Sequence, residues 1–427
     1  MKTLLKNARI LKMTDEPIFF GDVIVENNKI VYVGKSKKHE EKFDQEIDCE
    51  KNLLMPGFKN AHAHSAMTFV RSHADDMSLQ DWLFDYIIPR ESLLTEDDVY
   101  WLSQLAFLEY LTSGITAAFD MYYFSEAIAR AAEDFGFREQ IVLSKSYISK
   151  LDKEKIIKLY KQNDPEKLAN YSIGLHAEYT ASEDEFQTAV ELVQELKAPF
   201  YIHLAETKKE VEECKEKHDG MTPAEFLDSK GLWDYGGGAY HCCYMTKNDL
   251  KIFKDRDLTV ITCPGSNAKL ASGIAEIETM RENNIELAIG TDGPASNNCL
   301  DMFREMFLVA GLQKLLRKDP TVTPAYEILK MATVNSARTM NLKNADTLEE
   351  GKLADLILIN LNRPNMQPLN NISKNIVFSG SKDNIKLTMI NGKILYQDGE
   401  FKTKVSAEKI YKKCQEITNR ILTAELV

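Results

Sequence analysis

The sequence lacks a long hydrophobic run, and this absence argues against a membrane protein. No uninterrupted apolar stretch is long enough to span a bilayer. Residues 1–7 are basic, but they lead into alternating strand-like residues rather than into the apolar segment of a signal peptide. The seven cysteines are scattered, apart from Cys242 and Cys243, and resemble no disulfide framework. We therefore expect a cytoplasmic protein with no membrane partner.

The chain also lacks an excess of basic residues. Its formal net charge is −12, whereas binding to the phosphates of a nucleic acid requires a basic surface. This balance argues against nucleic acid as a partner. It favours a small uncharged or zwitterionic substrate.

Strand-like runs occupy both ends of the chain. At the N-terminus they cover residues 4–11, 23–26 and 30–34, and near the C-terminus they cover 356–359 and 387–396. Two β-rich ends that flank a long middle part predict one discontinuous β-sandwich domain, formed by residues 1–54 and 350–405. Two separate small β units are the weaker alternative.

The middle of the chain alternates short apolar runs with helical patterns, which is typical of an α/β protein with a parallel sheet. The length of 427 residues suits a large barrel with a smaller companion domain. We predict a (β/α)₈ TIM-type barrel over residues 55–349, followed by a C-terminal helix within 406–427. The candidate strands are 115–120, 173–176, 199–203, 238–241, 259–263 and 286–292, and the clearest helices are 183–197 and 249–256.

Histidines and acids close several of these apolar runs. The C-terminal ends of barrel strands converge on one face, where active sites are built. Residues two apart on a strand point the same way, so the side chains of His62 and His64 can face one metal. A single histidine at a strand end is more often structural than a ligand. However, five of the eight histidines occupy such positions, and they are joined by one aspartate: His62, His64, His176, His203, His241 and Asp292.

Glu206 follows one of these histidines closely. In the segment from His203 to Thr207, its carboxylate comes just past the predicted strand end. A glutamate on a surface helix is the ordinary interpretation of such a residue. Beside a metal-ligand histidine, a general acid/base is the better interpretation.

Taken in order, these segments resemble the amidohydrolase superfamily, and within it the methylthioadenosine/S-adenosylhomocysteine deaminase branch with its chlorohydrolase-like members. The resemblance covers nearly the whole chain. The matching segments are 56–68, 74–76, 82–83, 88–91, 120–123, 203–207, 239–242, 263–275, 290–298 and 350–356.

This resemblance implies a role for each candidate residue. It makes His62, His64, His203 and Asp292 the ligands of one divalent metal ion, zinc or alternatively iron. It makes Glu206 the proton-shuttling acid, with His241 and Asp292 orienting the hydrolytic water and Asp292 taking its proton. Glu91 and His176 would hold the purine nucleoside together with Glu206 and Asp292, and a homo-oligomer, dimer or tetramer, is expected.

The implied reaction is hydrolytic removal of the 6-amino group of an adenosine-type nucleoside, with release of ammonia. The nucleoside could be methylthioadenosine, S-adenosylhomocysteine, 5′-deoxyadenosine or adenosine. One departure bears on this choice: the family often carries an arginine where this chain has Leu143, with Lys145 two residues further on. A second family arginine falls in the next loop, where only Lys150, Lys153 and Lys155 are found.

Other functions stay open at this point. A guanine deaminase or an s-triazine or chlorohydrolase-like enzyme would share the metal site, and a non-catalytic scaffold would share the fold. His176 stands where binuclear relatives carry a bridging lysine, so we expect one metal. The cytidine-deaminase signature is excluded, because His176 and Glu178 form its first half while the Pro-Cys-x-x-Cys half is absent.

Overall fold

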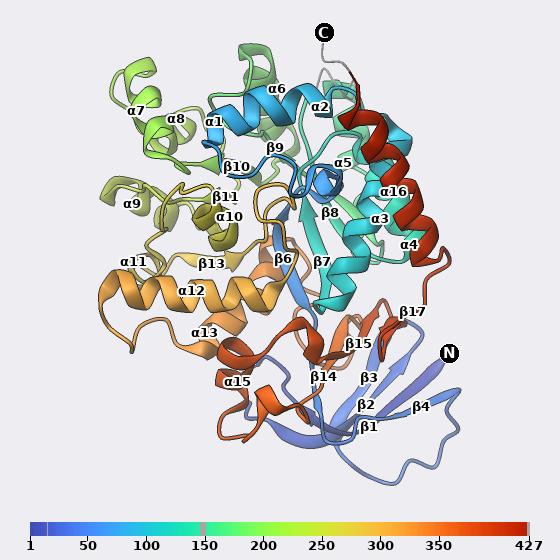
Figure 1. The fold of residues 1–427 in the computed structure, drawn as a ribbon. Helices are drawn as coiled ribbons and strands as arrows, with labels where there is room; N and C mark the ends of the chain where they lie inside the picture. The colour runs from blue at the N-terminus through green and yellow to red at the C-terminus, as the bar shows by residue number, and fades with distance from the viewer. Residues whose placement is uncertain (15, 146–150, 425–427) are drawn as a thin grey trace.

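The computed structural model describes residues 1–14, 16–145 and 151–424. Within this part of the chain, eight parallel strands lie in chain order around a barrel (Figure 1). Their side chains are almost all buried, as expected for parallel strands that pack on both faces. The strands are β6 (Phe58–Ala63), β7 (Ile115–Asp120), β8 (Arg138–Leu143), β9 (Ala169–Gly174), β10 (Phe200–Leu204), β11 (Gly237–His241), β12 (Thr259–Thr262) and β13 (Glu286–Ile289).

Helices connect the barrel strands and cover the outside of the barrel (Figure 1). Several of these helices begin at a residue whose side-chain hydroxyl or carboxylate caps the first turn. In α6, for example, the hydroxyl of Ser182 accepts the backbone N–H of Glu185. The helices of the barrel are α3 (Glu96–Thr112), α4 (Ser125–Phe135), α5 (Lys153–Tyr160), α6 (Glu183–Leu196), α7 (Lys208–Lys217), α8 (Pro223–Ser229), α9 (Lys247–Asp255), α10 (Pro264–Lys269), α11 (Ile277–Glu282), α12 (Met302–Arg317), α13 (Ala325–Lys330) and α14 (Ser336–Thr339). Shorter helical segments are η1 (Ser65–Val70), α1 (Leu79–Asp81), η2 (Trp82–Ile87), α2 (Ile88–Glu91) and η3 (Met331–Asn335).

Hydrogen bonds join the first strand of the barrel to the segment that follows the last strand. Asn60 in β6 accepts the backbone N–H of Thr291 at 2.8 Å and donates to its hydroxyl at 2.7 Å. The N–H of Asp292 donates to the carbonyl of His62 at 3.0 Å. Gly290 permits this approach, because a Cβ there would lie 2.6 Å from the Cβ of His62. These hydrogen bonds therefore bring His62 and Asp292 side by side.

The two chain ends form a second, mixed sheet below the barrel (Figure 1). The N-terminal strand β5 pairs with β1 on one side and with the C-terminal strand β14 on the other. The alternative of two separate β units is therefore wrong. The strands are β1 (Lys2–Ile10), β2 (Phe19–Glu26), β3 (Lys29–Lys35), β4 (Gln45–Asp48), β5 (Leu53–Pro56), β14 (Leu356–Ile359), β15 (Ile385–Ile390), β16 (Lys393–Gln397) and β17 (Glu400–Phe401). Short helices η4 (Pro364–Met366), α15 (Ile372–Ser379) and η5 (Lys382–Asn384) lie between β14 and β15.

A buried ion pair connects this sheet to the barrel. Arg138 at the start of β8 donates through Nε to Asp355 at 2.6 Å and through a terminal nitrogen at 3.1 Å. Both side chains are fully buried. The final helix α16 (Ala407–Leu422) packs along α3, where Arg420 binds Asp98 and the Cys414 thiol donates to the carbonyl of Trp101 at 3.3 Å.

The predicted fold class, an α/β barrel with a β domain from both chain ends, is confirmed. Several predicted strands were too long, because polar residues beyond the strand were included. β9 ends at Gly174, two residues before His176, and β13 ends at Ile289, three residues before Asp292. The run 387–396 is a hairpin that turns at Asn391 and Gly392. Among the described residues, no helix has the length and apolar character required to cross a membrane.

Candidate active site and metal centre

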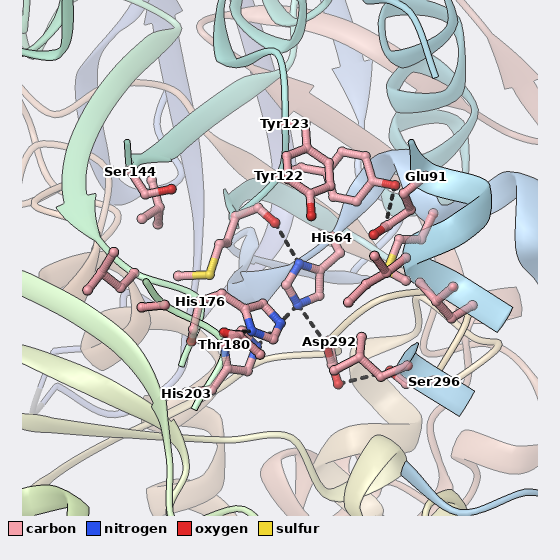
Figure 2. Close-up of a pocket in the computed structure, with 18 of the residues that line it drawn as sticks. His64, Glu91, Tyr122, Tyr123, Ser144, His176, Thr180, His203, Asp292 and Ser296 are labelled. Carbon is pink, nitrogen blue, oxygen red and sulfur yellow. Dashed lines mark hydrogen bonds and ion pairs between the residues drawn. The ribbon is translucent and has the colours of Figure 1, made fainter. Parts of the chain in front are cut away.

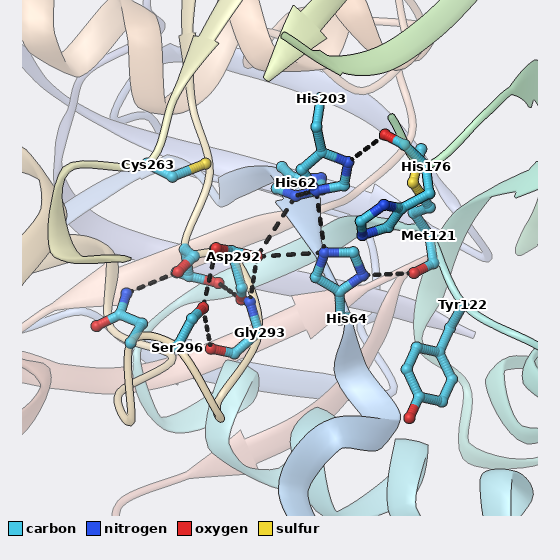
Figure 3. Close-up of polar contacts among 12 residues, drawn as sticks. His62, His64, Met121, Tyr122, His176, His203, Cys263, Asp292, Gly293 and Ser296 are labelled. Atoms are coloured by element: carbon cyan, nitrogen blue, oxygen red, sulfur yellow. Dashed lines mark hydrogen bonds and ion pairs between the residues drawn. The ribbon is translucent and has the colours of Figure 1, made fainter. Parts of the chain in front are cut away.

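Three histidines and one aspartate converge at the C-terminal end of the barrel (Figure 3). Nε2 of His203 lies 3.0 Å from Nε2 of His62 and 3.3 Å from Nε2 of His64. Oδ1 of Asp292 lies 3.2 Å from Nε2 of His64 and 3.5 Å from Nε2 of His62. Candidate ligand atoms of His62, His203, His241 and Asp292 also lie within 4.8 Å of one another. The structure therefore brings together all four residues predicted as ligands, with His241 beside them.

The hydrogen bonds of two histidines fit a metal ion at this point. Nδ1 of His203 lies 2.6 Å from the carbonyl oxygen of His176, and Nδ1 of His64 lies 2.6 Å from that of Met121. A carbonyl oxygen only accepts, so each Nδ1 carries a proton, and whenever both rings are neutral their Nε2 lone pairs face each other. Two lone pairs 3.3 Å apart cannot form a hydrogen bond. A cation that both nitrogens bind removes this conflict.

Burial keeps two of these rings in the form that binds metals. It lowers the pKa of His62 to about 3 and the pKa of His203 well below its ordinary value. Burial also lowers the pKa of His64, but the hydrogen bond and charge of Asp292 outweigh burial and raise that pKa to about 8. A metal ion would compete with that proton for the Nε2 lone pair of His64.

The backbone turns sharply at the strand ends that carry the site. Ala205, His241 and Asp292 have φ angles of 48°, 68° and 60°, in the left-handed region that non-glycine residues rarely adopt. The side chain of Asp292 is fixed by the N–H of Gly293 at 2.7 Å and by the hydroxyl of Ser296 at 2.9 Å. Such backbone strain is concentrated at functional sites, where the surrounding fold maintains it.

Glu206 lies beside this cluster, two residues beyond the end of β10. The hydroxyl of Ser272 donates to its Oε1 at 2.8 Å, and its Oε2 lies 3.8 Å from Nε2 of His241. Nδ1 of His241 donates to the side-chain oxygen of Asn267 at 2.7 Å. In the neutral ring this bond leaves Nε2 unprotonated and directed toward Glu206.

His64, His203, His241 and Asp292 of this cluster line a pocket, and the predicted substrate-binding residues line the same pocket (Figure 2). Glu91 in α2 accepts a hydrogen bond from the hydroxyl of Tyr122 at 2.6 Å. Burial raises the pKa of Glu91, and the Tyr122 hydrogen bond opposes this only in part. Nδ1 of His176 lies 2.9 Å from the hydroxyl oxygen of Thr180. Burial lowers the pKa of His176 to about 3.

Much of the pocket lining is apolar. The segments α1, η2 and α2 contribute part of it, together with one residue that precedes α5. These residues are Leu79, Trp82, Leu83, Ile87, Ile88 and Leu151.

Leu143, the residue in place of the expected arginine, does not face this pocket. It is fully buried among the apolar residues between barrel and helices, whereas its neighbours Val142, Ser144 and Lys145 line the pocket. Lys145 forms an ion pair with Asp184. Lys153 binds Glu191 and Lys155 binds Glu126, both near the protein surface. Lys150 lies outside the described residues.

Several residues that hold the site were not singled out from the sequence. Ser272, Asn267 and Ser296 position Glu206, His241 and Asp292. They lie in segments that carry the family resemblance, but a serine or asparagine in a loop has no spacing that indicates a partner. Only the folded chain identifies the carboxylate or imidazole that each one binds.

A second group of metal-binding residue types lies outside the pocket. Glu178, Cys214 and His218 have ligand atoms within 4.8 Å of one another. The carboxylate of Glu178 is already held by Lys217 at 2.6 Å and by His218 at 2.8 Å. Burial raises the pKa of the Cys214 thiol to about 12. The Glu178 carboxylate already has these two partners, so we assign no metal to this group.

Comparison with known proteins agrees with the geometry of the site. Residues 53–395 match the model of the amidohydrolase family. The chain therefore belongs to the amidohydrolase family.

Two relatives whose names state an activity match all or nearly all of the chain. It is 37% identical to the 5-methylthioadenosine/S-adenosylhomocysteine deaminase of Caldanaerobacter subterraneus subsp. tengcongensis over 100% of both chains. It is 38% identical to the 5′-deoxyadenosine deaminase of Methanocaldococcus jannaschii, over 93% of this chain and 95% of the other.

A solved structure shares the fold over nearly the whole chain. The adenosine deaminase of Xanthomonas campestris, with bound zinc, superimposes with a TM-score of 0.91, at 28% identity and 99% coverage of both chains. This similarity and the converging histidines and aspartate support a divalent metal ion at the site.

Proposed function

We propose that this protein is a metal-dependent hydrolytic deaminase that converts the 6-amino group of an adenosine-type nucleoside to the 6-oxo group and releases ammonia. The observation that carries this proposal is the placement of Glu206 beside the histidine and aspartate cluster, in a pocket that Glu91 and His176 also line. The relatives are named as deaminases of methylthioadenosine and S-adenosylhomocysteine or of 5′-deoxyadenosine, and these names support the same substrate class.

We propose one metal ion per chain, held by His62, His64, His203 and Asp292. When bound, the ion would act as a Lewis acid that lowers the pKa of a water molecule toward about 7. Zinc and iron(II) both suit these ligands, and zinc is favoured by the zinc-bound relative. Elemental analysis of the purified protein tests this proposal, and two tightly bound ions per chain would contradict it.

The protein side chains divide the proton transfers between them. Glu206 protonates the ring nitrogen beside the reacting carbon, which makes that carbon more electrophilic. His241 orients the attacking water through Nε2, since Asn267 fixes the opposite nitrogen. As the water adds to the reacting carbon, Asp292 receives one of its protons and passes it to the amino group, which leaves as ammonia when the C–N bond breaks. The remaining hydroxyl proton returns to Glu206, and the 6-oxo product keeps the proton on its ring nitrogen.

The pocket also favours some 5′ groups of the nucleoside over others. Glu91 is proposed to accept hydrogen bonds from the ribose hydroxyls, and His176 to contact the purine ring. Among the described residues that line the pocket, Lys145 is the only lysine or arginine, and Asp184 already pairs with it. We therefore expect methylthioadenosine and 5′-deoxyadenosine to give a higher kcat/KM than S-adenosylhomocysteine, because the described part of the pocket wall offers no unpaired cation to its carboxylate.

The assay is ammonia release and the adenine-to-hypoxanthine absorbance change, measured with these nucleosides and adenosine side by side. Glu206→Gln should lower kcat by about 10²- to 10⁴-fold, as expected for loss of a general acid/base, and leave metal content unchanged. Glu213→Gln is the matched control, because Glu213 lies in the adjacent helix and pairs with the exposed Lys209 at 3.6 Å. Near-normal kcat in Glu206→Gln would refute the role of Glu206.

Two further parts of the proposal concern the setting of the enzyme. The seven cysteines are all free, and most are buried, which suits a reducing cytoplasm. A homo-oligomer, dimer or tetramer, stays a prediction that light scattering of the purified protein would test.

A further inference from the structure

Glu210 holds the turn that carries Glu206. Its Oε1 accepts the N–H of Ala205 at 2.7 Å, and its Oε2 accepts the N–H of Glu206 at 2.8 Å. One carboxylate therefore binds two consecutive backbone donors just beyond the end of β10. The side chain is only 5% exposed, so water does not replace these bonds readily.

The backbone at this turn needs such support. Ala205 has a φ of 48°, which an alanine adopts only at a cost in free energy. The chain changes there from β10 to α7, which begins at Lys208. The direction of the Glu206 side chain follows from the orientation of its own backbone, and Glu210 fixes that backbone at the nitrogen.

Two other glutamates at the same helix position act differently. Glu185 in α6 and Glu225 in α8 both accept the N–H of the residue that caps their own helix, Ser182 and Thr222 respectively. Glu210 also interacts with the N–H of its own cap, Thr207, but its two hydrogen bonds reach past this cap to the two residues before it. The carboxylate of Glu210 therefore supports the turn before the helix.

The carboxylate is held there against an electrostatic cost. Burial and the nearby charge of Glu206 raise the pKa of Glu210 to about 7, although the N–H groups of Glu206, Ala205 and Thr207 oppose the shift. A neutral apolar side chain would avoid this cost, but it would leave two buried N–H groups without acceptors.

We propose that Glu210 is a positioning residue for the hydrolytic reaction, which holds the backbone of Ala205 and Glu206 so that the Glu206 carboxylate meets the substrate. This inference rests on the proposed function, in which Glu206 transfers the proton. Glu210 acts on the reaction only through Glu206. The carboxylate of Glu206 is fixed separately by the hydrogen bond from the hydroxyl of Ser272.

The test is Glu210→Gln in the full-length, metal-loaded protein. The carboxamide keeps one acceptor but directs its NH₂ group at the second backbone N–H, so one donor is lost. Misplacement of Glu206 should lower kcat by about 10- to 100-fold, with KM changed by less than about threefold. Metal content and melting temperature should stay close to those of Glu225→Gln, the matched control, which should keep kcat.

A third variant separates positioning from helix stability. Thr207→Val removes the cap of α7, where the hydroxyl of Thr207 accepts the N–H of Glu210 at 3.2 Å, but leaves the carboxylate in place. We expect this variant to keep most of kcat. If Glu210→Gln is not recovered folded, Glu210→Asp replaces it, because the shorter carboxylate cannot reach both donors.

The possible results separate the two proposals. A kcat within about threefold of wild type in Glu210→Gln, with Glu206→Gln inactive, overturns the positioning role and leaves the proposed function intact. Equal loss of kcat in Thr207→Val, or loss of the metal in Glu210→Gln, makes the role one of stability and also overturns it. Failure of the proposed function has a different signature, which is the absence of ammonia release by the wild-type protein with every nucleoside tested.

Discussion

Replacement of Asn267 by leucine tests how strictly His241 must be oriented. The side-chain oxygen of Asn267 accepts from Nδ1 of His241 at 2.7 Å, and Asn267 is 2% exposed. Leucine has a similar size but no acceptor, so Nδ1–H becomes a buried donor without a partner. Such a loss costs about 1–3 kcal/mol. If the cost falls on the transition state, kcat decreases by about 5- to 150-fold, since each tenfold corresponds to about 1.4 kcal/mol.

The assay is the initial rate of ammonia release over a range of nucleoside concentrations. Asn384→Leu is the matched control, because Asn384 is also buried and hydrogen-bonded but lies in the β domain. It should lower stability and leave kcat unchanged. The reasoning about His241 fails if Asn267→Leu keeps wild-type kcat, or if both variants lose kcat to the same extent.

Three further predictions address the ion pair, the metal and the substrate. Arg138→Met leaves Asp355 buried without its ion-pair partner and should lower the free energy of unfolding by about 3–5 kcal/mol. Urea unfolding measures this loss, and a loss no larger than that of the surface control Arg256→Met would contradict the prediction. Chelation should abolish activity and lower the melting temperature, because a ligand at 1,000 times its Kd contributes about 4 kcal/mol to stability; activity that survives complete metal removal would refute the metal dependence. Glu91→Gln should lower kcat/KM by about 10- to 150-fold through weaker charge-assisted hydrogen bonds to the substrate, whereas equal rates for Glu91→Gln and the control Glu96→Gln would show that Glu91 does not contact it.

The order of elements and the residue types at the strand ends could be predicted from the sequence. Apolar runs of four to six residues alternate with helical patterns, and these local patterns persist in the fold because each depends on neighbouring residues only. The spacing of His62 and His64 also predicts that their side chains share one face, because strand side chains alternate with a period of two. The convergence of distant strand ends follows once the strands are parallel and closed into a barrel.

The tertiary structure decided what each of these residues contacts. Leu143 illustrates the limit: both faces of a parallel strand are buried, so hydrophobicity does not show which side chains face the pocket and which face the helices. The protonated nitrogens of His64 and His203 depend on the carbonyls of Met121 and His176, which carry no sequence signal because every residue has a carbonyl. The hydrogen bonds of Glu210 likewise depend on the left-handed turn at Ala205, which only the packed barrel imposes on the chain.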